Sequence, residues 1–490
     1  QIERAIAVLY ALTGSFDRRG GNRVMTRQPL NAVSQHDLLS PEQQARALGL
    51  DARPLGPPAR GWVTARDTYR AILDGTPYRV RALFCFGTNV LASQADYAMA
   101  REALEALEFH VHCDLFETPS ARFADIVLPV NTPWEREGLR AGFEIDDRAD
   151  ALIQLRQRMV SPRGESRSDN DIVFDLAVRL GMGDAFFGGS LDAGWNHQLA
   201  PLGLDVQTLR AHPAGISRPQ PQYERKYART EAGDVRGFAT ETRRVELYSE
   251  HLLRHGYPPV PAHVAPRAVS DDEALRFPLL LGSTKNGYYC HSQHRGLASL
   301  RMRAPDPVVH LHPTLAARRH IAEGDWVRVT TPAGVARFRA AFDAGLGLDV
   351  LLAEYGWWQA CDSVGRDGFA MAGDQSSNFN ALVTTQDIDP ISGASPLRSF
   401  RCDVARAPAS NPARRPWDGM ARFRIAALDA AAEGVCAIAL DPLDDVGLPD
   451  YLPGQHVTVR VSIPGQGQPV TRAYSLTGPS SERDRRGYRI

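Results

Sequence analysis

The chain has 490 residues, of which 43% are hydrophobic and 23% are charged, and its formal net charge is −1. This length exceeds a single ordinary hydrophobic core and predicts roughly two to four domains. The near-zero charge argues against nucleic acid or an anionic membrane as the main partner, and no apolar run reaches the about 18 residues that a bilayer span needs. Six cysteines are scattered without a CxxC pair, which favours a reducing, cytoplasmic setting.

The N-terminal part alternates between a periodic and an irregular pattern. Apolar residues at helical spacing predict a helix over 2–12, and a glycine-rich loop follows it. Because Gln1 already lies at the start of this helical pattern, we expect a chain that is truncated at its start. Residues 31–62 show no hydrophobic periodicity, which predicts an irregular segment on the surface. Residues 67–73 should then form a short helix.

The segment 80–130 predicts a nucleotide-binding half-fold. Its apolar run 80–86 favours a fully buried strand of a parallel sheet, and a helix is expected to begin behind Ser93 as N-cap. Two further strands are predicted over 109–113 and 126–130. In parallel sheets of this kind, ligands bind beyond the carboxyl ends of the strands.

Polar residues follow the ends of the first two predicted strands. Gly87 would let the backbone approach a phosphate closely, and Asn89 lies two residues beyond it. Asp114 could accept hydrogen bonds from a ribose or a guanine. A turn glycine and a strand-end aspartate with structural roles explain the same residues equally well, so the spacing alone leaves both interpretations open.

The residues after this unit predict another helix and a basic loop. Ser168 is a suitable N-cap for apolar residues at helical spacing over 172–180. Arg163 and Arg167 could hold an anionic substrate or a cofactor phosphate. A solvated basic loop is the commoner explanation, and we favour it.

From 277 to 404 the pattern changes to short strands and tight turns, which predicts a small β-barrel. Residues 326–331 and 335–340 flank a Pro-Ala-Gly turn, and the second run alternates apolar and polar residues with a period of two. These two runs are therefore expected to form a hairpin with one buried and one wet face.

Three motifs resemble the molybdopterin oxidoreductase family, also called the dimethyl-sulfoxide-reductase family: GTN at 87–89, DLFET at 114–118 and ADIVLP at 124–129. Val90 stands where the family usually has proline. The resemblance implies an α/β Rossmann-like domain over 1–200, truncated at its N-terminus, which binds molybdopterin guanine dinucleotide with molybdenum. The cofactor contacts it implies in this domain are Gly87, Asn89, Asp114, Thr118 and Asp125.

Segments 279–301, 310–334 and 376–398 resemble the dinucleotide-binding barrel of the same family. The resemblance implies a six-stranded (double-psi) β-barrel over 277–404, joined to the first domain by a connecting segment over 201–276. The missing fourth ligand argues against zinc at the histidine-rich loop near Cys290, and we assign no metal ligand. The implied cofactor contacts of the barrel are Gly282, Ser283, Thr284, Lys285, His291, Ser292, His294, Arg295, Asn378 and Asn380.

A Pro-, Ala- and Arg-rich linker is predicted over 405–419, and a new domain follows it over 420–490. This domain resembles the antiparallel flavin-binding β-barrel of the ferredoxin–NADP reductase superfamily, and we expect it to be incomplete at its C-terminal end. The resemblance implies that FAD or FMN contacts Arg472, Tyr474 and Ser475, which supply a cation, an aromatic ring and a hydroxyl.

These resemblances imply an oxidoreductase with a small-molecule substrate, such as nitrate or another oxyanion or oxide. NAD(P)H is expected to reduce the flavin through a part beyond this fragment, and electrons would pass through an iron–sulfur cluster, also outside it, to molybdenum. Catalytic residues cannot be assigned. Two alternatives remain: a non-catalytic scaffold, or a flavin reductase whose upstream part is only an interaction module. The retained polar loops count against a scaffold.

Overall fold

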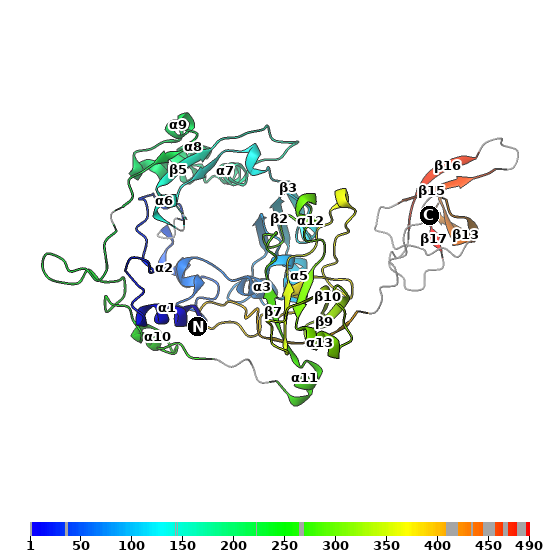
Figure 1. Cartoon of the computed structure of the whole chain (residues 1–490). Helices are drawn as coiled ribbons and strands as arrows, with labels where there is room; N and C mark the ends of the chain where they lie inside the picture. Colours follow the sequence, from blue (N-terminus) through cyan, green and yellow to red (C-terminus); the bar gives the residue numbers. More distant parts are fainter. Residues whose placement is uncertain are drawn as a thin grey trace. The chain divides into compact units, whose positions relative to one another are not determined.

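The computed structural model describes residues 2–34, 38–142, 144, 146–221, 223–263, 269–407, 420–432, 435–443, 456–463, 469–477 and 487–490. The chain forms two compact units, Gln1–Arg406 and Ala407–Ile490 (Figure 1). Most of the predicted linker over 405–419 lies outside the described residues. No helix in the described ranges has both the length and the apolar character that a bilayer crossing requires.

A three-stranded parallel sheet forms in the order β1 (Ala82–Phe86), β2 (Phe109–Asp114) and β3 (Ile126–Pro129), which confirms the predicted strands. Helices α3 (Ala65–Leu73) and α5 (Tyr97–Ala106) supply the core that packs with Leu83 of β1. The expectation that the first strand is fully buried is wrong, because Phe84 on the opposite face is 37% exposed. That face packs only partly, through Phe86 and its neighbours.

The longer helix after β1, α5, begins later than its sequence predicts, and a short helix precedes it. Ser93 closes the short helix α4 (Val90–Ser93), where its hydroxyl donates to the carbonyl oxygen of Asn89 at 2.7 Å. The N-cap of α5 is Asp96, whose Oδ1 accepts from the backbone N–H of Met99 at 3.2 Å. The prediction of Ser93 as the cap is therefore wrong, since the aspartate three residues later supplies the stronger acceptor.

The barrel is confirmed as a closed six-stranded sheet in the order β10-β8-β11-β7-β12-β9. The expected hairpin pairs Val335 with Thr330 and Arg339 with Trp326. Ala336, Phe338 and Ala340 point into the core as the period of two predicts. Its strands are β7 (Leu279–Thr284), β8 (Val308–Leu311), β9 (Trp326–Thr330), β10 (Val335–Phe342), β11 (Val350–Glu354) and β12 (Phe400–Arg406).

A third sheet of the first unit joins β4 (Gly138–Arg140), β5 (Leu152–Arg156) and β6 (Ile216–Ser217) in antiparallel pairs. Ser168 caps α7 (Asp169–Arg179) as predicted, accepting from the N–H of Asp171. The remaining α-helices of this unit are α1 (Ile2–Leu12), α2 (Pro41–Ala45), α6 (Asp147–Asp150), α7 (Asp169–Arg179), α8 (Leu191–Leu199), α9 (Val206–Ala211), α10 (Glu250–Arg254), α11 (Asp271–Arg276), α12 (Ala298–Arg301) and α13 (Pro313–Arg318).

Two side chains join the parallel sheet to the barrel within the first unit. Oδ2 of Asp96 accepts from both the N–H and the hydroxyl of Thr385, at 3.0 and 2.9 Å. Nδ2 of the fully buried Asn378 donates to the carbonyl oxygen of Leu91 in α4 at 2.9 Å. Both contacts connect residues almost 290 positions apart in sequence, so they fix how the sheet and the barrel loop pack.

The second unit contains two separate antiparallel sheets among its described residues. One joins β13 (Phe423–Ala432), β14 (Val435–Pro442) and β17 (Tyr488–Arg489), and the other joins β15 (His456–Val461) and β16 (Val470–Ser475). The predicted strands therefore form, whereas their closure into a flavin-binding barrel remains a prediction.

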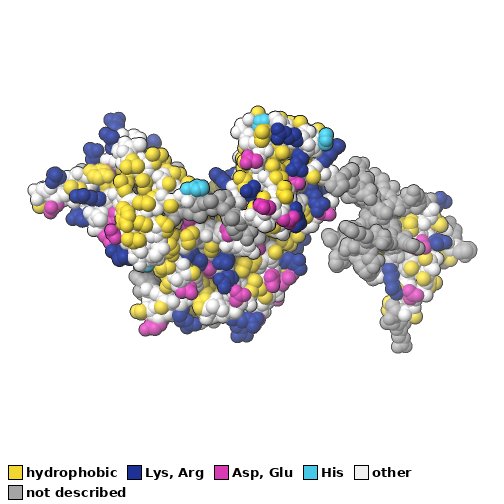
Figure 2. All heavy atoms as spheres, turned by 90° about the horizontal axis from the view of Figure 1, so that it is seen from below, with side chains coloured by type: hydrophobic (Ala, Val, Ile, Leu, Met, Phe, Trp, Pro, Cys, Tyr) yellow, Lys and Arg dark blue, Asp and Glu magenta, His cyan; other side chains and the backbone are white. Residues whose placement is uncertain are grey.

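The surface carries charges of both signs. Figure 2 shows dark blue and magenta side chains interspersed with apolar ones over the visible face, and the formal net charge is −1. The apolar stripe of α1 is part of this surface, because Ile2, Leu9 and Leu12 are 76%, 56% and 68% exposed.

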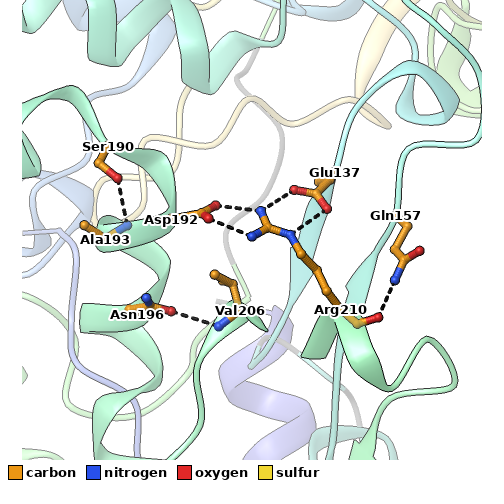
Figure 3. Close-up of polar contacts among 8 residues, drawn as sticks. All are labelled: Glu137, Gln157, Ser190, Asp192, Ala193, Asn196, Val206 and Arg210. Atoms are coloured by element: carbon orange, nitrogen blue, oxygen red, sulfur yellow. Dashed lines mark hydrogen bonds and ion pairs between the residues drawn. The ribbon is translucent and has the colours of Figure 1, made fainter. Parts of the chain in front are cut away.

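A double ion pair ties α9 to its neighbours (Figure 3). The guanidinium of Arg210 donates to both carboxylate oxygens of Glu137, at 3.0 and 2.6 Å, and to both oxygens of Asp192, each at 2.7 Å. This hydrogen bonding by Arg210 lowers the pKa of Asp192. Such bidentate pairs are the stronger kind of surface ion pair.

Replacing Asp96 with alanine should loosen the barrel loop around Thr385. The change removes a helix cap and leaves the Thr385 N–H without its acceptor, which together should lower the local free energy of opening by about 1–3 kcal/mol. Hydrogen exchange of peptides covering 381–387, followed by mass spectrometry, measures this. Asp74→Ala is the matched control, since its pair with Arg70 is about half exposed; equal exchange in the two variants would contradict the role of Asp96.

Replacing Arg210 with methionine should speed hydrogen exchange of α9 at pH 7. The free energy of local opening should fall by about 1 kcal/mol, a value that allows for the partial exposure of the ion-paired side chains. Because the folded pKa of Asp192 is lowered, the ion pair stabilises above the ordinary aspartate pKa near 4 and is lost as the pH falls below it. The difference from the unmodified chain should therefore shrink at pH 3, after correction for intrinsic exchange rates. Arg179→Met, which breaks a more exposed pair with Asp175, should show little effect at either pH.

Candidate functional site

The carboxyl end of β1 presents an open backbone and a buried amide. Gly87 has φ +53°, and an added Cβ would meet no atom within 4 Å, so the turn is open to a ligand. Asn89 is 6% exposed, and its Oδ1 accepts from the hydroxyl of Ser120 at 3.0 Å. Nδ2 of Asn89 has no hydrogen-bond partner among the described residues, which leaves a buried donor available.

The three predicted contacts near the end of β2 divide into two kinds. Thr118 accepts from the N–H of Ala121 at 3.2 Å, and Asp125 accepts from the N–H of His110 at 2.7 Å, so both stabilise local backbone. Asp114 accepts from the N–H of the following residue through Oδ1, at 2.7 Å. Its Oδ2 lies 3.5 Å from Nε2 of His112, within the sheet rather than in the turn.

The predicted contacts that begin the barrel lie along β7 and just beyond it. Gly282 faces β11, where an added Cβ would come within 2.7 Å of Cδ2 of Leu352, so packing explains this glycine. Ser283 and Thr284 are half-buried at the end of the strand, and Lys285 is exposed. Only these last three positions leave their side chains within reach of a ligand.

The loop 290–295 is built around a buried cation. Arg295 is 1% exposed, and it donates to the carbonyl oxygens of His291 at 2.5 Å and Tyr355 at 2.7 Å. Its guanidinium lies over the rings of Tyr289 and Trp357, and burial lowers its pKa to about 10. The structure thus gives Arg295 a role in holding the loop, because its two terminal nitrogens donate to backbone carbonyls. Its buried Nε has no hydrogen-bond partner among the described residues.

The other predicted residues of this loop differ in exposure. His291 and His294 are exposed and have φ values of +48° and +72°, and the backbone carbonyl of the buried Ser292 accepts from the indole of Trp358 at 2.8 Å. The neighbouring Glu354 has a raised pKa because of burial and accepts from Asn286 at 2.8 Å. Among the predicted contacts of this loop, the two histidines are therefore the accessible ones.

A continuous polar network joins Asn89 of the sheet to Asn380 of the barrel. The hydroxyl of Ser120 accepts from the N–H of Leu91 at 3.1 Å, and the Leu91 carbonyl accepts from Asn378. Oδ1 of Asn378 then accepts from the N–H of Asn380 at 3.1 Å. Nδ2 of Asn380, like that of Asn89, has no partner within the described part of the chain. The structure therefore brings two predicted contacts from different domains into one network, with a free donor at each end.

Two residues of this arrangement were missed in the sequence. Ser120 connects Asn89 to α4, and Asp96 anchors the barrel loop. An aspartate directly before the helical stripe that starts at Tyr97 is an N-cap signal and could have identified Asp96. No local signal marks Ser120, because its partners lie about 30 positions away.

The basic loop and the flavin motif are both exposed. Arg167 pairs with Asp175 at 3.0 Å and is half exposed, as a solvated loop predicts. Arg472, Tyr474 and Ser475 are exposed on β16. Since side chains alternate along a strand, Arg472 and Tyr474 share one face and Ser475 occupies the other.

Residues 1–179 match the family model described as molybdopterin oxidoreductase, and residues 279–401 match the one described as "Molydopterin dinucleotide binding domain". The second of these ranges coincides with the closed barrel, and the first includes the whole parallel sheet. Both matches end before the second unit.

Relatives cover most of this chain but a smaller share of their own length. A dopamine dehydroxylase from Eggerthella lenta is 27% identical, over 84% of this chain and 47% of the relative. A dimethyl sulfoxide/trimethylamine N-oxide reductase from Rhodobacter capsulatus is 28% identical, over 58% of this chain and 36% of the relative. The chain therefore spans about half the length, or less, of these relatives.

The fold also resembles a solved structure. Acetylene hydratase from Pelobacter acetylenicus superposes with a TM-score of 0.69 at 25% identity, covering 82% of this chain and 58% of that chain. The chain therefore carries molybdopterin oxidoreductase domains, including the dinucleotide-binding one, and it is an enzyme related to the dimethyl sulfoxide reductases.

Proposed function

We propose that this chain binds molybdopterin guanine dinucleotide where the carboxyl ends of β1 and β2 meet the barrel loop that contains Asn378 and Asn380. The observation that supports this position is the pair of buried amide donors, Nδ2 of Asn89 and Nδ2 of Asn380, without partners among the described residues. A buried unpaired donor costs about 1–3 kcal/mol. A ligand that offers carbonyl, ring-nitrogen or phosphate acceptors would remove this cost.

The donor set suits a pterin or a guanine. Each side-chain amide can donate to a heteroaromatic edge, while the polar network holds its orientation from behind. Gly87 has room for a close backbone approach, and Ser283, Thr284 and Lys285 lie at the end of β7 as candidates for phosphate contacts. When bound, the cofactor and its molybdenum supply the redox chemistry, and the chain supplies position and electrostatics.

For the reaction, we propose reduction of a small oxide or oxyanion substrate, with nitrate as one candidate. The dimethyl sulfoxide/trimethylamine N-oxide reductase among the relatives supports an oxide substrate. The acetylene hydratase and the dopamine dehydroxylase show that related chains act on other substrates. Substrate screens should therefore include nitrate, an N-oxide and a sulfoxide.

For the electron supply, we propose that the second unit holds a flavin that NAD(P)H reduces. Support comes from Arg472 and Tyr474, which project from the same face of β16 and could hold a flavin phosphate and ring. An iron–sulfur cluster would carry the electrons onward to molybdenum.

Replacing Asn89 or Asn380 with alanine should weaken cofactor binding about 5- to 150-fold and lower the cofactor content of the purified chain, because each removes a donor worth about 1–3 kcal/mol in the complex. Molybdenum measured by mass spectrometry and GMP released by acid hydrolysis report cofactor content directly. Asn31→Ala is the matched control, since this amide donates to the carbonyl oxygen of His197, away from the proposed site.

The unmodified chain should contain both molybdenum and GMP. Full occupancy in both the Asn89→Ala and Asn380→Ala variants would show that the cofactor binds elsewhere. A chain that lacks both molybdenum and GMP, when made in cells that synthesise the cofactor, would refute the proposed function itself.

Replacing Arg472 with alanine should reduce the flavin content of the full chain at least about tenfold, since a charge-assisted phosphate contact contributes about 1.5–3 kcal/mol. Absorbance near 450 nm after purification with added FAD or FMN measures the content. Arg460→Ala removes a neighbouring cation on β15 and should leave the content unchanged. Flavin retained equally in both variants, or absent from the unmodified chain, would exclude the proposed contact.

A further inference from the structure

One face of the parallel sheet carries polar residues where the opposite face is apolar. The polar residues on this face are Cys85 of β1 and His110 and His112 of β2, and they alternate with apolar neighbours. The sheet register places Cys85 directly beside His112. All three lie on the face of Leu83, which packs into the core formed by α3 and α5. Their exposures are 6%, 1% and 0%. A thiol and two imidazoles thus occupy positions where that core would accept aliphatic side chains.

The three side chains converge. One possible ligand atom from each lies within 4.8 Å of those of the other two. Nδ1 of His112 and Nε2 of His110 are 3.4 Å apart. This distance exceeds the range of about 2.7–3.2 Å for ordinary hydrogen bonds from nitrogen. Two nitrogens bound to one tetrahedral zinc ion, each about 2.0 Å from the metal, would lie about 3.3 Å apart.

A carboxylate stands behind one of the imidazoles. Oδ2 of Asp114 is 3.5 Å from Nε2 of His112, and this nitrogen has no hydrogen bond among the described residues. Histidines that bind a metal usually donate their second N–H to such a carboxylate, which fixes the ring and its tautomer. Asp114 therefore occupies the place of an orienting group for His112 if Nδ1 faces a metal.

We propose that Cys85, His110 and His112 form a buried binding site for a thiophilic divalent cation, of which zinc is the best match. Thiolate sulfur and imidazole nitrogen are the ligands that zinc prefers, and a tetrahedral ion would take water or a fourth side chain as its remaining ligand. On binding, the Cys85 thiol releases its proton to solvent, and both imidazoles bind as neutral ligands. Zinc binding at this site does not require the molybdenum cofactor and would stabilise the sheet.

The test is zinc binding by the full chain, first treated with a chelator and then dialysed against zinc-buffered solution. We expect the unmodified chain to bind about one equivalent of zinc. Cys85→Ala or His110→Ala should weaken this binding at least about 100-fold. Cobalt(II) in place of zinc should give a thiolate charge-transfer band in the near ultraviolet, and this band should be absent from Cys85→Ala.

Two control variants separate this site from other cysteines. Cys113 is fully buried on β2 but points to the opposite face, so Cys113→Ala should perturb packing without changing zinc content. Cys290→Ala tests the exposed histidine-rich loop. Zinc and the cobalt band retained in Cys85→Ala, or lost only in Cys290→Ala, would overturn the proposal. So would an unmodified chain that binds no zinc.

Two controls distinguish the loss of zinc binding from misfolding of a variant. Each variant is compared by circular dichroism, and zinc should raise the thermal midpoint of the unmodified chain and of Cys113→Ala. Should Cys85→Ala fail to fold, His110→Gln provides the same comparison with a side chain of similar size. An equal thermal shift in the ligand variants would mean that zinc acts at another site.

Discussion

The hydrogen bonds that Asp96 and Asn378 make across the first unit hold its parallel sheet against the barrel loop. Asp96 caps α5 with one carboxylate oxygen and binds Thr385 with the other. Asn378 reaches from the barrel loop to the carbonyl oxygen of Leu91 in α4. Because both groups satisfy backbone partners on two elements at once, neither element can move alone without exposing a buried polar atom. The proposed cofactor site exists only while these contacts hold.

Strand β2 contributes residues to both proposed sites. Asp114 at its end belongs to the proposed cofactor site, while His110 and His112 point into the core beneath. Val111 and Cys113 face the other way and pack with apolar residues. A change of pairing register by one residue would exchange these two sets, so the polar and apolar faces together specify one register. The proposed metal site would thus reinforce the strand that also belongs to the proposed cofactor site.

Sequence periodicity predicted the elements well, whereas the use of each polar side chain depended on tertiary contacts. Alternation of Ala336, Phe338 and Ala340 predicted the hairpin, since burial on one face is a local property of a strand. The role of Arg295 could not be predicted, because its acceptors lie on a segment 60 positions away. The cluster of Cys85 with His110 was missed for the same reason: spacing rules for metal ligands describe neighbours in sequence, and these residues meet only through strand pairing.

The separation of Leu91 and Asn378 by 287 positions also has a consequence for synthesis. At translation rates of about 5–20 residues per second, α4 would leave the ribosome about 15–60 s before the barrel loop that completes it. During that interval the strands can pair locally, but the carbonyl of Leu91 has no barrel partner. If the cofactor binds at the proposed site, its enclosure must therefore follow translation of the barrel, which would make cofactor insertion a late event in the life of the nascent chain.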